Sequence, residues 1–545
     1  MRKFKFVQPP ISGKESCLIV KLNGAGEVKN KINLIYQQQK IKAEVKHKKI
    51  AKLICLHLSE HGIFVEDNGK GIFFLNTGEI YQITKKDRTF SAFIFENYGI
   101  CSATPGFKIL VGTLDNECLK NNKIEIKKQF YFNENDGCFL IPTANNQLLR
   151  CSEGEIKEIA NGSEGVLIKP SDEVDPFSFI KNPKKNNIKL QEILADGLSC
   201  PETSSFFLNN EEAAFLLEII IFFILFCQSM PTRPIILVRG EKGTGKSTLF
   251  KMLGLLIYGK YFKLSLIPRG RRDLEVEFAN NTFCCFDNVD RSLKQSQKDV
   301  LAAVATGCGM RTRQLFTTGK QKRYSPLPVI GMTTRTTPFS ADDDDLIERQ
   351  VIFQLAKRDS FTPETKIIRK VLQNRDSIMS SVVNKIPSVL KGLKTDSPID
   401  VGPFRMADFS DFAEKVAIPI FKNRYSNEEI EKRLVKVFVK LRASQQAVLC
   451  ANPLHYVLDD YVNKEVKNSK PITILTSDLF NKLITIDKKM AYGFSKSCKN
   501  LISFGKLLKN NASLFEARYG YSSKRGSNNK LEHTFSYESP EPLEI

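Results

Sequence analysis

The stretch GEKGTGKS, Gly240 to Ser247, has the residue types and the spacing needed to bind a polyphosphate. It fits G-x-x-x-x-G-K-[ST] and follows an apolar strand, which is the context in which this pattern holds phosphates. Its glycines let backbone N–H groups turn towards the phosphates, and the positive end of the following helix adds to them. We expect a nucleotide to be bound by Gly240, Glu241, Lys242, Gly243, Thr244, Gly245, Lys246, Ser247 and Thr248.

A second apolar strand, in TFCCFDNVDR, ends in an acid, Asp287. A carboxylate at the end of a neighbouring strand can hold the Mg²⁺ that accompanies the nucleotide. In such a site Lys246 would reach the β and γ phosphates, and the Ser247 hydroxyl would bind the metal. The sequence therefore predicts ATP and Mg²⁺ as cofactors, with Ser247 and Asp287 as metal ligands.

The residue after this acid raises a question about hydrolysis, because ATPases commonly place a second acid there and this chain has Asn288. An amide can still orient the attacking water, while the proton passes to solvent or to a nearby carboxylate. Asp290 is the first candidate for that base, and Glu275 or Glu277 on the preceding segment is the second.

Two further segments offer catalytic groups. The strand PVIGMTTRTTP ends in Thr333 and Thr334, one of which could sense the γ-phosphate. Arg349, in DDLIERQVIFQL, could enter a neighbouring subunit's site as an arginine finger that offsets transition-state charge. The alternative for Arg349 is an ordinary ion pair with Glu348 or with the acidic run 342–345.

Basic residues gather in two places that would suit nucleic acid. No acid occurs between Asp299 and Asp342, and RQLFTTGKQKRYS in this window predicts a basic hairpin that follows phosphates without reading bases. The end of the chain predicts a helix, a basic helix and a basic-tipped hairpin, which is the winged-helix order. The alternatives are a solvated basic loop and a module for protein contacts. The expected DNA ligands are Arg313, Lys320, Lys322, Arg323, Lys496, Lys499, Lys524 and Arg525.

Composition supports these expectations. A formal charge of +21 and a pI near 9.3 favour a polyanionic partner, although a Lys-rich surface from an AT-rich genome would look similar. Thirteen cysteines without a CxxC pair indicate reduced thiols, and hence the cytoplasm. The longest apolar run, Ile219 to Cys227, is shorter than the roughly 20 residues of a membrane span, so we expect a buried helix and no membrane.

The sequence predicts four regions. Residues 1–185 show short strand patterns and are expected to form a strand-rich α+β accessory domain; residues 189–360 alternate helices with apolar strands, as in a parallel α/β ATPase core. Residues 361–465 are expected to form a helical lid and connector, and residues 470–545 the winged-helix-like domain.

The order of strand, GEKGTGKS, FCCFDN, basic hairpin, PVIGMTT and LIERQ resembles the AAA+ core of superfamily 3 helicases. More closely, the chain is similar to the helicase half of primase-helicases from phages, plasmids and integrated bacterial elements; FDNVD, ATGCGMRTRQLFTTGK and FRMADFSDFAE are the stretches that support this. The resemblance implies a hexameric ring with ATP between subunits, single-stranded DNA in the ring and duplex at the carboxyl-terminal domain. It also implies that Thr334 takes the sensor place. The expected role is DNA replication of a mobile element, with a separate primase or other replication proteins as further partners.

Two other functions stay open. A regulatory or anti-phage defence ATPase would use ATP to oligomerise and would sense nucleic acid, and a weaker alternative is a non-enzymatic origin-binding protein. The pattern HLSEH, His57 to His61, fits an inverted zinc-protease motif but lies in an amphipathic helix, so we interpret it as structural.

Overall fold

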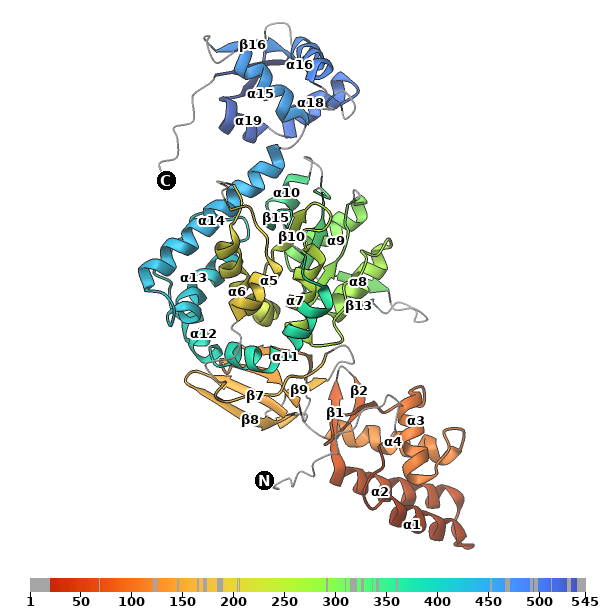
Figure 1. Cartoon of the computed structure of the whole chain (residues 1–545). Coiled ribbons are helices and arrows are strands. Elements are labelled where there is room, and N and C mark those ends of the chain that lie inside the picture. Colours follow the sequence, from red (N-terminus) through yellow and green to blue (C-terminus); the bar gives the residue numbers. More distant parts are fainter. Residues whose placement is uncertain are drawn as a thin grey trace. The chain divides into compact units, whose positions relative to one another are not determined.

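The computed structural model (Figure 1) describes residues 20–536 apart from 68, 121–124, 145–146, 164–165, 170–173, 184–189, 203, 205, 291–292, 309, 314–320, 325–327, 336, 340–342, 359–360, 451–452, 466–470, 491–493, 495–497, 511 and 527–530. The chain forms two compact units whose segments alternate along the sequence. The first comprises Met1–Tyr131, Leu140–Arg150 and Lys157–Pro176; the second comprises Phe132–Phe139, Cys151–Ile156 and Phe177–Ile545. Helices and strands occur in both, which confirms the predicted mixed α/β content.

The first unit contains more helix than the sequence predicted. Its elements are α1 (Ala25–Gln37), α2 (Ala43–His61), β1 (Gly62–Asp67), β2 (Lys70–Leu75), β3 (Ile80–Gln82), α3 (Arg88–Tyr98) and α4 (Pro105–Lys120), with β1, β2 and β3 in one antiparallel sheet. Asp87 caps α3 by accepting from two backbone N–H groups, and Phe90 and Phe93 of that helix are buried. Apolar residues at these helical spacings were missed because the same residue types also favour strands.

The remaining strands of this part of the chain are short. Strands β4 (Glu125–Lys128) and β9 (Val166–Lys169) pair in parallel. Another sheet has the order β5 (Tyr131–Asn133), β6 (Cys138–Pro142), β7 (Gln147–Ser152) and β8 (Glu155–Ala160).

The His57 and His61 pair has structural partners. His57 Nδ1 is 2.8 Å from the Tyr98 hydroxyl, and its Nε2 is 2.8 Å from the Asn23 carbonyl. His61 Nε2 lies 3.1 Å from the same carbonyl. Among the described residues no group of three His, Cys, Asp or Glu side chains could hold a metal ion. The two rings thus connect α2 to its neighbours, as a structural interpretation of HLSEH requires.

The second unit is built on a four-stranded parallel sheet in the order β11, β14, β10, β15. The strands are β10 (Ile235–Gly240), β11 (Phe283–Phe286), β14 (Val329–Thr334) and β15 (Gln350–Leu355). Every residue of β11 and β14 is buried. In such a sheet all carboxyl ends lie at one edge, so residues that follow β10, β11 and β14 can meet.

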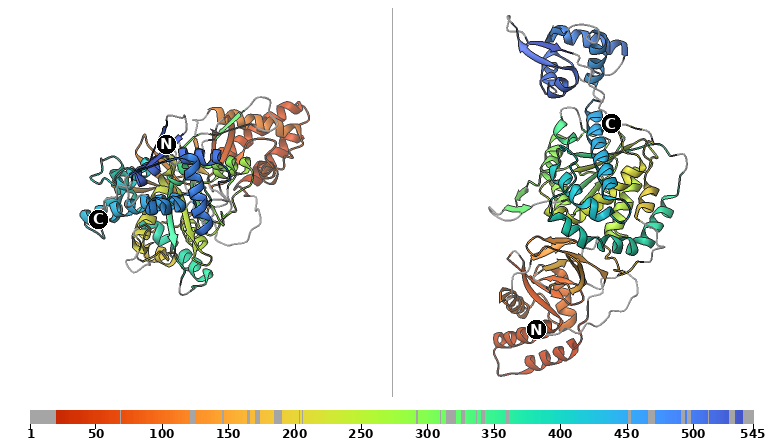
Figure 2. Two further views of the ribbon diagram at one scale, coloured as in Figure 1. Left: turned by 90° about the horizontal axis from the view of Figure 1, so that it is seen from above. Right: turned by 90° about the vertical axis from the view of Figure 1, so that its left-hand side faces the viewer.

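Helices cover both faces of this sheet (Figures 1 and 2). Helices α8 (Arg271–Asn280) and α9 (Gln295–Ala305) share a buried cluster with Cys284 of β11. On the other face, a Cβ added to Gly331 would lie 2.7 Å from the Phe250 ring of α7 (Lys246–Tyr258), and 2.9 Å from the Cys285 sulfur. The adjacent cysteines therefore point to opposite faces, as predicted.

The long apolar helix α6 (Asn210–Phe226) lies in the core of the second unit. Asn209 and Glu212 form a capping box at its start. The segment Asn210–Ser229 is long and apolar enough to span a membrane, but 83% of its most apolar window is buried inside the protein. Its one deeply buried acid, Glu218, is 2% exposed and bonds Lys385 Nζ at 2.8 Å and Arg424 Nη2 at 2.5 Å. These contacts fit a core helix rather than a lipid-facing one.

The helices that follow the sheet are α11 (Glu364–Val383), α12 (Ile386–Leu393), α13 (Ala407–Phe421) and α14 (Asn427–Cys450). Helix α11 packs on α7, and its buried Arg375 donates to the Leu256 and Ile257 carbonyls at 3.0 and 3.2 Å. These carbonyls belong to the last turn of α7, where a cation is favoured by the helix dipole.

The carboxyl-terminal region differs from the prediction in one element. Its elements are α15 (Pro453–Glu465), β16 (Ile472–Leu475), α16 (Thr476–Met490), α18 (Leu501–Asn510), α19 (Ala512–Tyr519), β17 (Ser522–Arg525) and β18 (Leu531–Phe535), with the sheet in the order β16, β18, β17. The first strand of the expected basic-tipped hairpin was predicted to be SLFEARYGY, and this was wrong, because most of this segment forms α19 and the strand follows it as β17. Phe515 and Tyr519 lie four residues apart, so a helix buries both rings in one cluster. Lys524 and Arg525 therefore lie in β17 rather than in a turn.

Because His533 is buried, the stability of the carboxyl-terminal region should depend on pH. Its ring is fully buried and lies 2.8 Å from both the Thr476 and the Tyr521 hydroxyls; burial lowers its pKa to about 4. The unfolded chain takes up this proton near pH 6.5, whereas the folded chain does so only near pH 4. The free energy of unfolding should therefore fall by roughly 3 kcal/mol as the pH drops from 6.5 to 4.

Hydrogen exchange of the β16 and β18 amides, measured in the full chain between pH 7 and 4, tests this after correction for intrinsic exchange rates. His533→Gln should flatten the pH dependence, whereas His47→Gln, a change at a half-buried His of the first unit, should not. Equal pH dependence in wild type and His533→Gln would contradict the assignment.

Candidate functional site

The glycine-rich loop joins β10 to α7, and its backbone has the conformation that glycine permits. Gly243 and Gly245 have φ values of 85° and 90°, which a residue with a Cβ rarely adopts. Gly245 is the residue before the first turn of α7, so the free N–H groups of that turn follow it directly. Thr244 Oγ1 donates to the Glu241 carbonyl at 3.0 Å and holds the loop in this shape.

Lys246 is the buried cation of this loop. It is 8% exposed, and its Nζ donates to the Gly240 and Glu241 carbonyls at 2.7 and 2.9 Å. Burial lowers the pKa of Lys246, while Asp290 and Asp287 act against this shift. The ammonium therefore lies among backbone oxygens of the loop itself, and an incoming anion would compete favourably for it.

Asp287 connects the carboxyl ends of three strands. Its Oδ1 accepts from Ser247 Oγ at 2.6 Å and from Thr333 Oγ1 at 2.5 Å. Thr333 Oγ1 in turn accepts from the Asn288 N–H at 2.9 Å. One hydroxyl from the start of α7 and one from the end of β14 thus orient this carboxylate. Of the two threonines considered from the sequence, Thr333 is the one that contacts Asp287.

A carboxylate and a hydroxyl at this distance suit a hard cation. Mg²⁺ prefers oxygen ligands and usually takes only one or two from the protein, with water and phosphate completing the shell. Ser247 and Asp287 supply such a pair, and the fit does not depend on a larger cluster of acids.

Asn288 and Asp290 lie beside this centre. Asn288 has φ of 54°, an uncommon value for a residue other than glycine, and its Nδ2 is 3.4 Å from Asp287 Oδ2. Asp290 accepts from the Arg335 backbone N–H at 2.6 Å, from Arg335 Nε at 2.7 Å and from Thr334 Oγ1 at 3.3 Å. Burial acts to raise the pKa of Asp290, but these Arg335 contacts outweigh it and hold the pKa below its usual value.

A cavity of about 580 Å³ lies over the loop and contains most of these groups. Within the described part of the chain, Asp290 and Glu364 are the acids that line it, whereas Glu275 and Glu277 do not. Glu275 instead pairs with Arg271, and Glu277 lies 3.3 Å from the Asn281 amide. The lining comprises Lys242, Gly243, Gly245, Lys246, Ser247, Thr248, Asn288, Asp290, Arg335, Arg358, Phe361, Thr362, Glu364 and Ile367.

Five of these lining residues come from the segment after β15 and were not expected to reach the site: Arg358, Phe361, Thr362, Glu364 and Ile367. The segment LAKRDSFTPE carries no motif that marks it, because its proximity to the loop arises from the packing of α11 on α7. Arg335 also lines the cavity; it lies in the acid-free stretch between Asp299 and Asp342, and nothing in the sequence placed it at the nucleotide.

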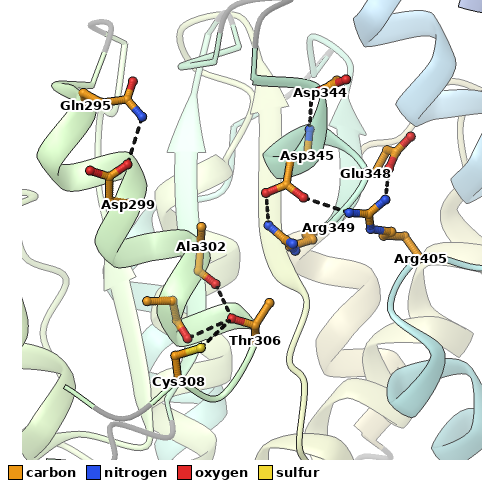
Figure 3. A network of polar contacts seen from close by, with 11 residues as sticks. Gln295, Asp299, Ala302, Thr306, Cys308, Asp344, Asp345, Glu348, Arg349 and Arg405 are labelled. Carbon is orange, nitrogen blue, oxygen red and sulfur yellow. Dashed lines mark hydrogen bonds and ion pairs between the residues drawn. The ribbon is translucent and has the colours of Figure 1, made fainter. Parts of the chain in front are cut away.

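Arg349 lies between α10 (Asp344–Ile347) and β15 and has partners in its own chain (Figure 3). Its Nη1 pairs with Asp345, and Asp345 also accepts from Arg405 at 2.9 Å. Arg405 further bonds Glu348 at 3.0 Å. Among the described residues that line the loop cavity, Arg349 is absent. It therefore takes part in the ion-pair network that was considered as the alternative to a finger.

The predicted DNA ligands are described only in part. Strands β12 (Met310–Arg313) and β13 (Gln321–Tyr324) form an antiparallel hairpin in which Arg311 pairs with Arg323. Lys320 and Lys496 lie outside the described residues. Lys499 precedes α18 instead of lying on it, and the side chains of Lys524 and Arg525 are exposed on β17.

Comparison with known proteins finds a family model that matches the central segment of the chain. Residues 206–419 match the family model described as "Actinomycete integrative conjugative element replication protein". This central segment resembles mobile-element replication proteins. The match contains the glycine-rich loop, Asp287, Thr333 and Arg349, and it confirms the resemblance stated from the sequence. The sequence matches none of the curated proteins with which it was compared.

Solved structures of helicases were also found. "SCCmec type IV Cch - active helicase" has 15% identity and a TM-score of 0.35, with 83% of this chain and 76% of that chain covered. The apo C-terminal region of NrS-1 has 12% identity and a TM-score of 0.41, covering 89% and 98%. A JCV helicase has 15% identity and a TM-score of 0.24, covering 47% and 67%. At these scores the likeness supports no inference about this chain.

The hydroxyl of Thr333 can be tested without any assumption about activity. Thr333→Val removes the donor to Asp287 and the acceptor of the Asn288 N–H; Thr333 is fully buried and both hydrogen bonds are partly buried. Losing these bonds should lower the free energy of unfolding by about 1–3 kcal/mol. Urea unfolding measures this. Thr306→Val, at an exposed helix end, should change it by less than about 0.5 kcal/mol. Equal midpoints for wild type and Thr333→Val would contradict the described role.

Proposed function

We propose that this protein is an ATP-dependent DNA helicase, or DNA-translocating ATPase, that acts in the replication of a mobile genetic element. The observation that carries the proposal is the meeting of Lys246, Ser247, Asp287 and Thr333 at one edge of a parallel sheet. The family match of residues 206–419 to a replication protein supports the biological setting.

Different residues of the site have different roles in binding ATP and its metal ion. The glycine-rich loop and the first turn of α7 bind the phosphates, and Lys246 leaves its carbonyl partners to pair with the β and γ oxygens. Ser247 and Asp287 hold Mg²⁺, which offsets phosphate charge when bound. Thr333 keeps the Asp287 carboxylate oriented, and Thr334 takes the sensor place through Asp290.

Asn288 orients the water that attacks the γ-phosphate, since its amide lies beside Asp287 and lines the cavity. Asp290 stays the candidate base by position. Its lowered pKa makes it a weak proton acceptor, however, so its contribution is largest if Arg335 turns away to a phosphate. The proton otherwise leaves to solvent.

DNA would be bound by the hairpin of β12 and β13 and by Lys320, while a ring of six subunits encloses one strand. Basic residues at such a place bind backbone phosphates without base specificity. The carboxyl-terminal region, through Lys499, Lys524 and Arg525, would bind duplex, as in winged-helix proteins. The protein would act in the cytoplasm, where a separate primase could serve the same fork.

Lys246→Ala tests the nucleotide site. The change removes the cation expected at the β and γ phosphates, so DNA-stimulated ATP hydrolysis at low salt should fall by about 100-fold or more. Lys251→Ala is the matched control, because Lys251 lies on the same helix as Lys246 but is partly exposed and pairs with Glu364 of α11; this variant should retain most activity. Wild-type protein without DNA-stimulated ATPase, or activity left intact in Lys246→Ala, would refute the proposal.

Unwinding decides between this function and a regulatory or defence ATPase. ATP-driven separation of a forked duplex by the wild-type protein is the expected result. ATP-dependent oligomerisation without strand separation would instead favour nucleic-acid sensing.

Arg349 is proposed to act in the site of a neighbouring subunit after leaving Asp345. Arg349→Ala and Lys246→Ala proteins should each be inactive alone, yet regain ATPase activity when mixed. Some interfaces then combine an intact Arg349 with an intact Lys246. Mixtures that stay inactive, although the subunits exchange, would show that Arg349 serves only the network with Asp345 and Arg405.

A further inference from the structure

Arg358 is held beside the glycine-rich loop by contacts on one side of its guanidinium. It follows β15, where the Ala356 N–H donates to the Ser199 carbonyl at 2.6 Å. Arg358 Nη1 donates to the Asp196 carbonyl at 3.0 Å. The Asp196 carboxylate itself bonds Lys370 Nζ at 2.6 Å, so this acid is already paired with another cation.

The other side of this guanidinium faces the start of α7. A Cβ added to Gly245 would lie 2.9 Å from Arg358 Nη2, 3.1 Å from Cζ and 3.2 Å from Nε. Arg358 lines the same cavity as Lys246 and Ser247. Backbone N–H groups of such a loop cradle the α and β phosphates, so the guanidinium lies at the place where those phosphates would be bound.

Two donor atoms of Arg358 lack partners in the described part of the chain. Nε and Nη2 are inaccessible to solvent, and neither makes a hydrogen bond there. Burial lowers the pKa of Arg358, but a guanidinium stays charged in proteins. Buried donors of a charged group that have no acceptor are costly, and an anion at this position would satisfy both at once.

We propose that Arg358 binds the phosphate chain of a nucleotide held by its own subunit, next to Gly245. This inference rests on the proposed nucleotide site and adds a cation that sequence motifs did not reveal. Arg358 differs in this from Arg349, whose proposed target lies in a neighbouring subunit. The guanidinium of Arg358 has several N–H donors in one planar fork, so it could make paired hydrogen bonds to phosphate oxygens that the single ammonium of Lys246 cannot make.

Calorimetric titration of the full chain with Mg²⁺ and either ATP or inorganic triphosphate tests the proposal. Inorganic triphosphate has no base or sugar, so it reports on phosphate contacts alone. Arg358→Met keeps an unbranched side chain of similar apolar reach and removes the charged guanidinium, and it should weaken the binding of both ligands by roughly 10- to 100-fold. Arg358→Lys should regain part of this loss, because it restores the charge without the fork.

Arg369→Met is the matched control, since Arg369 is an exposed residue of α11 that is not among the residues lining the described cavity. It should bind both ligands as wild type does. Wild-type affinity in Arg358→Met would overturn the inference, and so would a loss for ATP with none for triphosphate. An equal loss in Arg369→Met would also overturn it. If wild-type protein bound neither ligand, the nucleotide function itself would fail.

Discussion

The Asp287 carboxylate is the point on which the arrangement of the site depends. It accepts hydroxyl donors from the start of α7 and from the end of β14, while its own backbone continues β11. The hydroxyl donors satisfy its partly buried oxygens and fix their direction, and a carboxylate oriented in this way can hold a divalent cation. Because the strands are parallel and adjacent, one residue at the end of each is enough to build this centre. The rest of the second unit keeps those strand ends in register.

Much of this centre could be predicted from local patterns. The glycine spacing around Lys246, the apolar strand before Asp287 and the two threonines after β14 are all continuous in sequence. Their proximity follows from the sheet topology. The sequence could not predict which of Thr333 and Thr334 contacts Asp287, because strand alternation alone does not give the position of the Asp287 oxygen. In the structure the contact is made by Thr333, whose hydroxyl donates to Asp287 at 2.5 Å.

What the sequence did not reveal depends on long-range packing. Arg358 and Phe361 reach the loop because α11 lies on α7, and no periodicity in LAKRDSFTPE indicates this. The segment Ala512–Tyr519 was mistaken for a strand because aromatic residues favour strands in isolation. Burial of Phe515 and Tyr519 on one helical face outweighs that preference. Tertiary contacts thus decided both cases.

The Arg375 contacts with the last turn of α7 have a mechanical consequence. Two donor bonds from a buried cation join the far end of that helix to α11, and each bond to a charged group contributes about 1.5–3 kcal/mol. The two helices should therefore move as one rigid lever, since sliding between them would break both bonds. A small shift of α7 on binding of a phosphate by Lys246 would then move all 20 residues of α11 with it.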